Sequence, residues 1–295
     1  MAYGNEKSKF HSTLNAWRLS RTDLLIVVSL TGVVALASGS VILVLPRFAE
    51  ALIPAIVIGG ISALVLAIRR HDVAALITRE KALYQQIEAL ITLSRFMHLR
   101  LPLPPFREGA ISPDLGLLLY QELSLLTPAC IVECGAGVST LIIGYFLQKQ
   151  GRGHLISLEH DPMWATRVRK WVDHHNLQEQ VTVLECPLEP IAIQGREYQW
   201  YAKTGWESCF LNNATIDFVF VDGPPEWTHQ WARYPMLPLL RPFLSPQCEI
   251  LVDDVDRQND RKTVLRWVTE FDTAVEFLPC EEGAAILRFS PLVTR

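Results

Sequence analysis

Two long apolar runs stand near the start of the chain, at residues 24–45 and 51–68. At 1.5 Å per residue, helices of these lengths would extend about 33 and 27 Å, close to the roughly 30 Å hydrocarbon core of a bilayer. Residues 46–50 separate the runs, and a pair of adjacent glycines in the second run would allow close helix packing. The pattern predicts a two-helix transmembrane hairpin over residues 23–69.

Basic residues are concentrated on both flanks of this hairpin, whereas its connector contains only Arg47. They are Lys7, Lys9, Arg18, Arg21, Arg69, Arg70, Arg79 and Lys81. The positive-inside rule then places both ends in the cytoplasm, with residues 1–22 as a cytoplasmic segment of a multi-pass inner or plasma membrane protein. The lipid bilayer is the expected partner. The alternatives are a cleaved signal peptide ending near residue 37 and a hairpin buried in a globular core.

Residues 70–111 combine an amphipathic helix with a linker. Apolar residues recur at helical spacing from residue 71 to about residue 98, with charged residues between them. Three prolines within residues 101–105 end the pattern. Three interpretations of this helix are open. It is a stalk, a helix packed on the domain that comes after it, or a coil that forms a homo-oligomer. In the last case, the oligomer forms through this helix or through the hairpin.

Strand-like and helix-like segments alternate through residues 112–295. The predicted strands are 130–133, 154–159, 181–185, 216–222, 249–253, 273–278 and 284–289, and the predicted helices are 114–126, 139–150, 162–175, 227–240 and 259–271. Such alternation predicts βαβ units and a seven-stranded, mostly parallel sheet covered on both faces. Only residues 279–283 separate the last two strands, too few for a crossover helix, so the last strand is expected to run antiparallel.

Charge and cysteine usage exclude two classes of function. The formal net charge of −4 argues against a protein that binds nucleic acid through a general positive field. The six cysteines are scattered without a C-x-x-C pair, so no zinc site is expected, and reduced thiols are the simpler interpretation.

The segment I-V-E-C-G-A-G-V-S-T at residues 131–140 follows the first strand and opens a helix. Glycines let the backbone approach a ligand, and free N–H groups at a helix start favour negative charge. A dinucleotide fingerprint would be G-x-G-x-x-G, and Thr140 stands where its third glycine belongs.

This segment resembles motif I of class I S-adenosylmethionine-dependent methyltransferases. Four further matches follow in order: L-E-H-D at 158–161, V-T-V-L-E-C at 181–186, D-F-V-F-V-D-G-P at 217–224 and I-L-V-D-D-V at 250–255. The resemblance covers roughly residues 112–290 and implies a Rossmann-like fold with S-adenosylmethionine as cofactor. It does not extend to the N-terminal hairpin.

The resemblance also implies roles for particular residues. Those assigned to the cofactor are Glu133, Gly135, Gly137, Ser139, Glu159 and Glu189. The loop residues would frame the methionine portion, Glu159 would bind the ribose hydroxyls, and the loop at Glu189 would lie near adenine. Two alternatives are that Glu133 only bonds its own loop and that Glu159 is a solvated strand end.

Asp222, Asp253 and Asp254 are the candidate catalytic residues, because each closes a strand at the edge where open α/β sheets bind ligands. Relatives resembling catechol O-methyltransferase have an aspartate after the fourth strand and an Asp-Asn pair after the fifth. Here the pair is Asp-Asp, and the lysine that follows the first acid in those relatives is missing. The three carboxylates would repel one another unless they share a proton, bind Mg²⁺ or a similar metal ion, or meet basic residues. Alternatively, Asp254 caps the next segment and Asp222 bonds loop amides.

Two further groups of residues have two interpretations each. Arg233, Tyr234 and Arg257 would bind an anionic acceptor or lie on solvated helix faces. The aromatic cluster of Tyr198, Trp200, Tyr201 and Trp206 would line an acceptor pocket or form a packed flap.

The predicted function is transfer of a methyl group from S-adenosylmethionine to an acceptor that the sequence does not identify. Direct displacement needs mainly alignment of the acceptor with the methyl group, which agrees with the absence of a Ser-His-Asp constellation. The alternatives are a membrane scaffold whose methyltransferase-like domain has lost catalysis, and an aminopropyltransferase-like enzyme of the same fold. The consecutive glycines expected of the latter are absent.

Overall fold

The computed structural model describes residues 46–107, 109–210 and 215–289, with side chains from residue 56 onward. The chain divides into two compact units, Met1–Lys81 and Ala82–Arg295. This boundary falls within the segment 70–111 that was expected to connect hairpin and catalytic domain.

Helix α3 is continuous from Pro46 to Met97 and contains the second apolar run, whereas the first run, residues 24–45, lies outside the described residues. Among the helices of the described residues, none is long and apolar enough to cross a membrane. The predicted transmembrane hairpin is therefore not supported, and the predicted membrane localisation was wrong.

The second unit, Ala82–Arg295, is built on a seven-stranded sheet with the order β3-β2-β1-β6-β7-β9-β8. Its strands are β1 (Cys130–Cys134), β2 (His154–Glu159), β3 (Val181–Glu185), β6 (Ile216–Val221), β7 (Leu244–Asp253), β8 (Thr273–Leu278) and β9 (Ala284–Phe289). The first five of these pair in parallel, and β9 runs antiparallel to both β7 and β8. The predicted sheet with a reversed last strand is confirmed. Because β1 lies between β2 and β6, the loop after it opens where the strand order changes direction.

Side chains alternate along the central strands between two hydrophobic cores, one on each face of the sheet. Ile131 and Phe220 belong to the core on one face, and Val132 and Val221 to the core on the other. Successive side chains of a strand point to opposite faces, so a strand buried on both sides reads as an uninterrupted apolar run. This explains why the sequence of β6, I-D-F-V-F-V, is almost entirely apolar.

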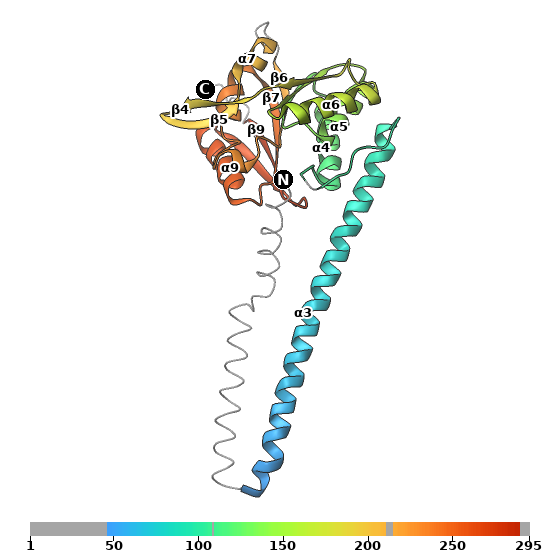
Figure 1. The fold of residues 1–295 in the computed structure, drawn as a ribbon, viewed down its shortest axis with the longest axis vertical. Coiled ribbons are helices and arrows are strands. Elements are labelled where there is room, and N and C mark those ends of the chain that lie inside the picture. The colour runs from blue at the N-terminus through green and yellow to red at the C-terminus, as the bar shows by residue number, and fades with distance from the viewer. Residues whose placement is uncertain (1–45, 108, 211–214, 290–295) are drawn as a thin grey trace, which may run out of the picture. The chain divides into compact units, whose positions relative to one another are not determined.

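Three helices cover the first face: α4 (Pro113–Leu126), α5 (Val138–Gln150) and α6 (Pro162–His175). The other face is covered by α8 (Met236–Leu240) and α9 (Gln258–Phe271) together with α7 (Lys203–Trp206). Figure 1 shows α4, α5 and α6 on the side of the sheet away from α9. Short 3-10 helices occupy Glu207–Phe210, Glu226–Thr228 and Arg241–Phe243.

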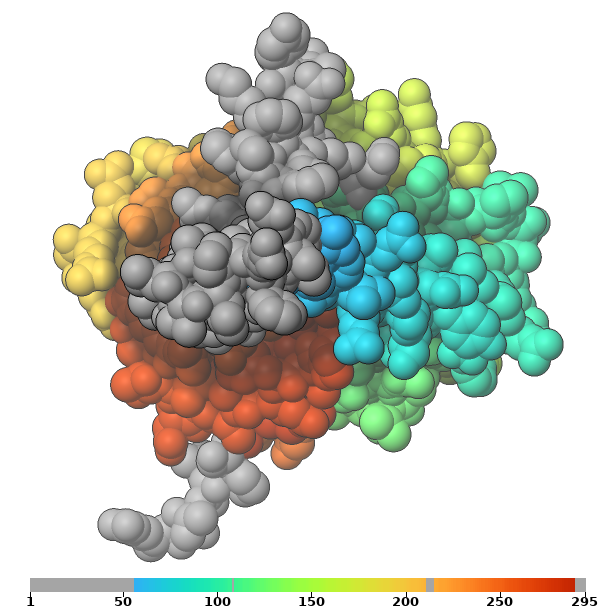
Figure 2. All heavy atoms as spheres, turned by 90° about the horizontal axis from the view of Figure 1, so that it is seen from below, coloured from blue at the N-terminus to red at the C-terminus, as the bar shows by residue number. Residues whose placement is uncertain are grey.

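An antiparallel hairpin, β4 (Leu188–Ile193) with β5 (Arg196–Tyr201), was not predicted. A Gln-Gly turn with positive φ at both residues joins its strands. Glycine at the second position of a two-residue turn favours a hairpin, but the residue before it is usually Asn, Asp or Gly, so Gln194 made the signal weak. The hairpin, yellow in Figures 1 and 2, lies at one side of the second unit, next to the orange and red C-terminal segments.

The predicted helix 227–240 was mostly wrong, because only Glu226–Thr228 and Met236–Leu240 form short helices there. Pro235 explains the break: its ring disfavours helical geometry at Tyr234, and it has no N–H to donate. Residues 229–235 form turns instead, and this places Arg233 differently from a helical residue.

Candidate active site

The loop between β1 and α5 approaches the loop after β6 closely at Gly135. This residue has a φ of 95°, and a Cβ atom there would lie 3.1 Å from the backbone nitrogen of Gly223. Gly137 differs, since its φ of −173° suits any residue and a Cβ would meet nothing closer than the Ser139 hydroxyl at 3.9 Å. Protein packing thus requires glycine at 135, whereas Gly137 is the N-cap of α5, a position where glycine is common.

Glu133 is fully buried beneath this loop. Its Oε2 accepts hydrogen bonds from the hydroxyls of Thr140 and Ser157. Burial raises the pKa of Glu133 to about 7, and these hydroxyls together with Ser139 partly offset that rise. Glu133 therefore stabilises the loop through these hydrogen bonds. Its contact with a cofactor stays a prediction.

Glu159 ends β2 and is also buried, so it is not a solvated strand end. Its Oε2 accepts from the backbone N–H of Ala136 at 3.2 Å, and its Oε1 accepts from that of Asp161 at 2.8 Å. Asp161 in turn caps α6 by accepting from the N–H of Met163. The Glu159 carboxylate therefore lies directly beside the loop of Gly135, and its contact with a ribose stays a prediction.

Glu189 lies in β4 and not in a loop. Its side chain is exposed, and its Oε1 accepts from the backbone N–H of Lys203 at 3.2 Å. That Glu189 lies near adenine stays a prediction. The sequence placed this residue in a loop, whereas it belongs to a strand of the hairpin.

The structure brings Asp222, Asp253 and Asp254 together at the carboxyl ends of β6 and β7, with one oxygen of each within 4.8 Å of the others. Successive strand residues normally point to opposite faces. Asp254, however, has a φ of 62°, and this left-handed turn lets its side chain join that of Asp253. An aspartate in this region of φ is uncommon, and such strain is concentrated at functional sites.

Arg233 lies inside this acidic cluster with only 2% of its surface exposed. Its Nη2 donates to Asp254 Oδ2 at 2.6 Å and lies 3.3 Å from Asp222 Oδ1. Its Nη1 donates to the carbonyl oxygen of Asp253 at 2.6 Å, and its Nε lies 3.7 Å from Asp260. The interpretation of Arg233 as a solvated helix residue was therefore wrong, and the sequence offered no signal for a buried position.

A second arginine approaches the same cluster from the surface. Arg257 Nη1 lies 2.7 Å from Asp254 Oδ2, with 42% of the Arg257 side chain exposed. Burial raises the pKa of Asp253 to about 7, with the charge of Asp254 as the next cause. Burial and then the charge of Asp253 raise the pKa of Asp222 as well. The two arginines thus only partly neutralise the acids.

The aromatic cluster is a packed flap. Tyr198, Trp200, Tyr201 and Trp206 are each at most 2% exposed. Tyr198 stacks on Tyr234 at 5.1 Å between ring centroids, and its hydroxyl accepts from Arg266 of α9 at 3.0 Å. These residues attach the β4–β5 hairpin to the second face of the sheet.

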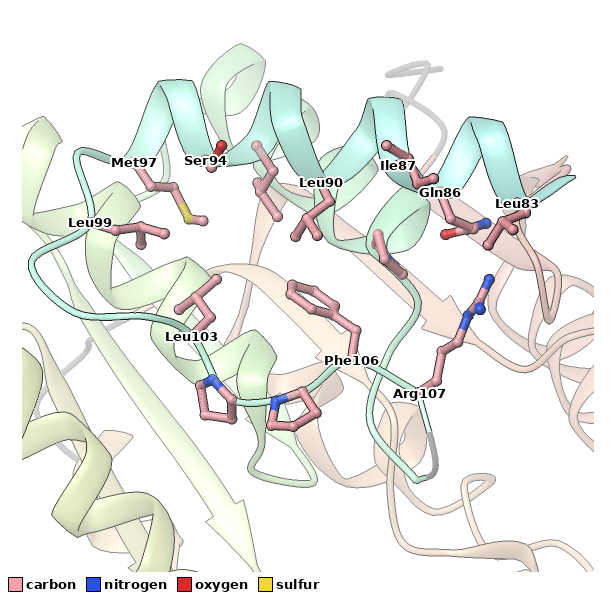
Figure 3. Close-up of a pocket in the computed structure, with 14 residues that line it drawn as sticks. Leu83, Gln86, Ile87, Leu90, Ser94, Met97, Leu99, Leu103, Phe106 and Arg107 are labelled. Carbon is pink, nitrogen blue, oxygen red and sulfur yellow. The ribbon is translucent and has the colours of Figure 1, made fainter. Parts of the chain in front are cut away.

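An apolar cavity of about 450 Å³ lies elsewhere in the second unit, between the C-terminal turns of α3 and residues 99–107. Figure 3 shows Leu90, Leu103 and Phe106 directed into it, with Arg107 at one end. None of the predicted cofactor or catalytic residues lines this cavity. The acids and the glycine loop, not this cavity, form the candidate active site.

The sequence of residues 132–255 matches the model of a family described as a methyltransferase domain. This match covers both the glycine loop and all three clustered aspartates. No curated protein matches the chain significantly.

Among solved structures, the methyltransferase PaMTH1 of Podospora anserina, bound to S-adenosylhomocysteine, is 16% identical with a TM-score of 0.53, and the match covers 72% of this chain and 95% of that chain. An O-methyltransferase of Bacillus cereus with the same ligand is 17% identical with a TM-score of 0.46, covering 70% and 91%. The O-methyltransferase TomG of Streptomyces achromogenes, bound to S-adenosylmethionine, is 16% identical with a TM-score of 0.43, covering 70% and 90%.

At such identities the similarity is evidence for the fold only. Of the three structures, the first, with a TM-score of 0.53, supports that fold. The family match concerns the sequence of the site itself. Together they agree with the predicted enzyme class and cofactor: residues 132–255 match a methyltransferase domain, and the fold is similar to that of a methyltransferase bound to S-adenosylhomocysteine.

Proposed function

We propose that the enzyme is an O-methyltransferase, and that its acceptor hydroxyl binds at the cluster of Asp222, Asp253 and Asp254. The observation that carries this proposal is the convergence of the three carboxylates beside the glycine loop. An oxygen acceptor must lose its proton as it attacks, and carboxylates with raised pKa values are suited to receive that proton. An amine acceptor that arrives neutral would need no such group.

The charge balance of the cluster supports a bound divalent cation. Asp222, Asp253, Asp254 and Asp260 meet two guanidinium groups, those of Arg233 and Arg257. Full ionisation therefore leaves two negative charges in a largely buried site, which a single divalent ion would neutralise. Without it, the acids would take up protons, as the raised pKa values indicate.

The donor atoms also fit a hard cation such as Mg²⁺. Arg233 engages Asp222 Oδ1 and Asp254 Oδ2, and the N–H of Asp254 engages Asp253 Oδ1. Each of the three carboxylates thus keeps a second oxygen for an ion, and Mg²⁺ prefers oxygen ligands. When bound, the ion would act as a Lewis acid that lowers the pKa of an acceptor hydroxyl.

The chain's own residues then account for the reaction. Glu159 and the loop of Gly135 hold the cofactor, and the acidic cluster holds the acceptor in line with the methyl group. The acceptor oxygen forms a bond to the methyl carbon as the carbon–sulfur bond breaks, and the electron pair stays on sulfur. Asp222, whose side chain is 23% exposed against 7% for Asp254, is the carboxylate most accessible to the acceptor and to a water that takes the hydroxyl proton away. Alignment supplies much of the acceleration in such a displacement.

We expect the protein with S-adenosylhomocysteine bound to bind one Mg²⁺ or Mn²⁺ ion in a calorimetric titration. Asp253→Asn should abolish this binding, because it removes a charged ligand. Glu249→Gln, a change in the same strand outside the cluster, is the control and should leave metal binding unchanged. If neither ion binds to the wild-type protein and chelators do not affect methyl transfer, the metal part of the proposal is wrong.

The acceptor class is tested directly with a panel of phenols, alcohols, amines and thiols, by measuring S-adenosylhomocysteine formation. Transfer to hydroxyl compounds, lost in Asp222→Asn while cofactor binding persists, is the expected result. Transfer only to nitrogen or sulfur acceptors would contradict O-methylation.

The assignment of Glu159 is tested by Glu159→Gln. We expect the Kd for S-adenosylhomocysteine to rise about tenfold or more, since a hydrogen bond to a charged group contributes roughly 1.5–3 kcal/mol. Glu185 ends the neighbouring strand opposite Glu159 and is exposed, so Glu185→Gln is a matched control that should leave the Kd unchanged. Equal effects of the two substitutions would refute a specific role for Glu159.

A further inference from the structure

Tyr201, the last residue of β5, has a buried hydroxyl that the fold does not use. The residue is 1% exposed, and its Oη has no hydrogen-bond partner among the described residues. Buried polar groups in proteins almost always have partners, and a missing one needs an explanation. Since the hydroxyl is shielded from bulk solvent, its partner must be a bound ligand or a buried water.

The surroundings of this hydroxyl are those of the candidate active site. Oη lies 2.6 Å from the position that a Cβ atom on Gly223 would occupy, and the Cα of Gly135 lies 3.0 Å from that same position. The hydroxyl is therefore at the junction of the two loops that come after β1 and β6. Burial raises the pKa of Tyr201 well above its usual value, and the charges of Cys134, Glu159 and Asp222 raise it further, so the hydroxyl stays protonated.

Tyr198 on the same strand shows the contrast. It is equally buried, at 2% exposure, but its hydroxyl accepts a hydrogen bond from Arg266 and its ring stacks on Tyr234. One tyrosine of β5 thus has its polar group satisfied by the protein, whereas the other directs an unsatisfied hydroxyl to the site. The hairpin that carries both lies between β3 and β6 in the chain, outside the seven-stranded sheet.

We propose that Tyr201 is a cofactor-binding residue whose hydroxyl forms a hydrogen bond with the methionine portion of S-adenosylmethionine, so that the β4–β5 hairpin is a wall of the cofactor site. This inference rests on the proposed positions of the cofactor at Glu159 and the Gly135 loop. It assigns a binding role to the hairpin, which the sequence motifs do not include. The hydroxyl is a neutral group that can donate to the cofactor's carboxylate or accept from its ammonium group.

The test compares Tyr201→Phe with Tyr198→Phe in the full-length protein, each measured for thermal stability without ligand and for S-adenosylhomocysteine binding by calorimetry. For Tyr201→Phe we expect the Kd to rise about tenfold or more, the effect of one hydrogen bond to a charged group, with Tm unchanged or higher because an unpaired polar group has been removed. For Tyr198→Phe we expect the opposite pattern: a lower Tm and an unchanged Kd.

An unchanged Kd in Tyr201→Phe would overturn the inference, whatever its Tm, because a hydroxyl bonded only to a buried water or to the protein would not affect the cofactor. A rise in Kd of similar size in both variants would also overturn it, since the hairpin would then act only through its general stability. If the wild-type protein binds no S-adenosylhomocysteine, the cofactor site itself fails and this inference fails with it. The two failures are thus distinguished by the wild-type titration.

Discussion

Substitution of Arg233 by methionine is expected to lower the free energy of unfolding by about 3–5 kcal/mol, the usual cost of removing one partner from a buried ion pair. The methionine fills a similar volume, so the loss is electrostatic in origin. Without the guanidinium group, Asp222, Asp254 and Asp260 would face one another in a buried site. Denaturant unfolding monitored by circular dichroism measures the effect.

Arg257→Met is the matched control for this prediction. Arg257 bonds the same oxygen of Asp254 at nearly the same distance as Arg233 does, but its side chain is 42% exposed. Ion pairs at the surface contribute about 0–1 kcal/mol, so we expect the control to lose no more than that. A loss below about 1 kcal/mol in Arg233→Met would show that the acids are neutralised by protons, with little contribution from the arginine.

Gly135→Ala is expected to abolish most of the cofactor binding, raising the Kd for S-adenosylhomocysteine by about tenfold or more. Two penalties add in this variant. The left-handed backbone costs a residue with a Cβ about 1–2 kcal/mol. The new methyl group would also lie 3.1 Å from the backbone nitrogen and 3.3 Å from the Cα of Gly223, and overpacking of this kind costs about 1–3 kcal/mol.

The contact atoms here are backbone atoms, so the loop itself must shift, and it carries the N–H of Ala136 away from Glu159. Calorimetry measures the affinity, and thermal unfolding measures the stability. Gly195→Ala is the matched control, because Gly195 also has a positive φ, of 75°, but a Cβ there would meet nothing within 4 Å. The control should lose only the backbone penalty and bind the cofactor normally. Normal binding in Gly135→Ala would refute the role of this close approach.

The sequence alone determined the architecture of the second unit. Strands buried on both faces read as short apolar runs, and five of the predicted helices and strands have the bounds that the structure gives: β2, β3, α6, β8 and β9. The short connection after β8 was enough to predict the reversed last strand, because no crossover helix fits there. The order of the motifs along these strands predicted which acids would meet at one edge of the sheet.

The sequence was misleading where an apolar run has more than one physical solution. Residues 51–68 have the length and composition of a membrane span, but they form part of a 52-residue helix, and no helix of the described residues is long and apolar enough to cross a membrane. Local hydropathy records only the composition of a window. It does not record how far the helix continues or which residues make up its next turns.

Only the tertiary structure decided how the acidic cluster is neutralised. Arg233 and Asp254 are separated by 21 residues, and a turn before α8 brings the guanidinium group into the cluster. No periodicity marks such a contact, because it depends on the packing of two loops against one sheet edge. The same holds for Tyr201. The Gln-Gly turn was a weak signal for its strand, and the direction of its hydroxyl toward Gly223 depends on the way the hairpin packs on the rest of the domain.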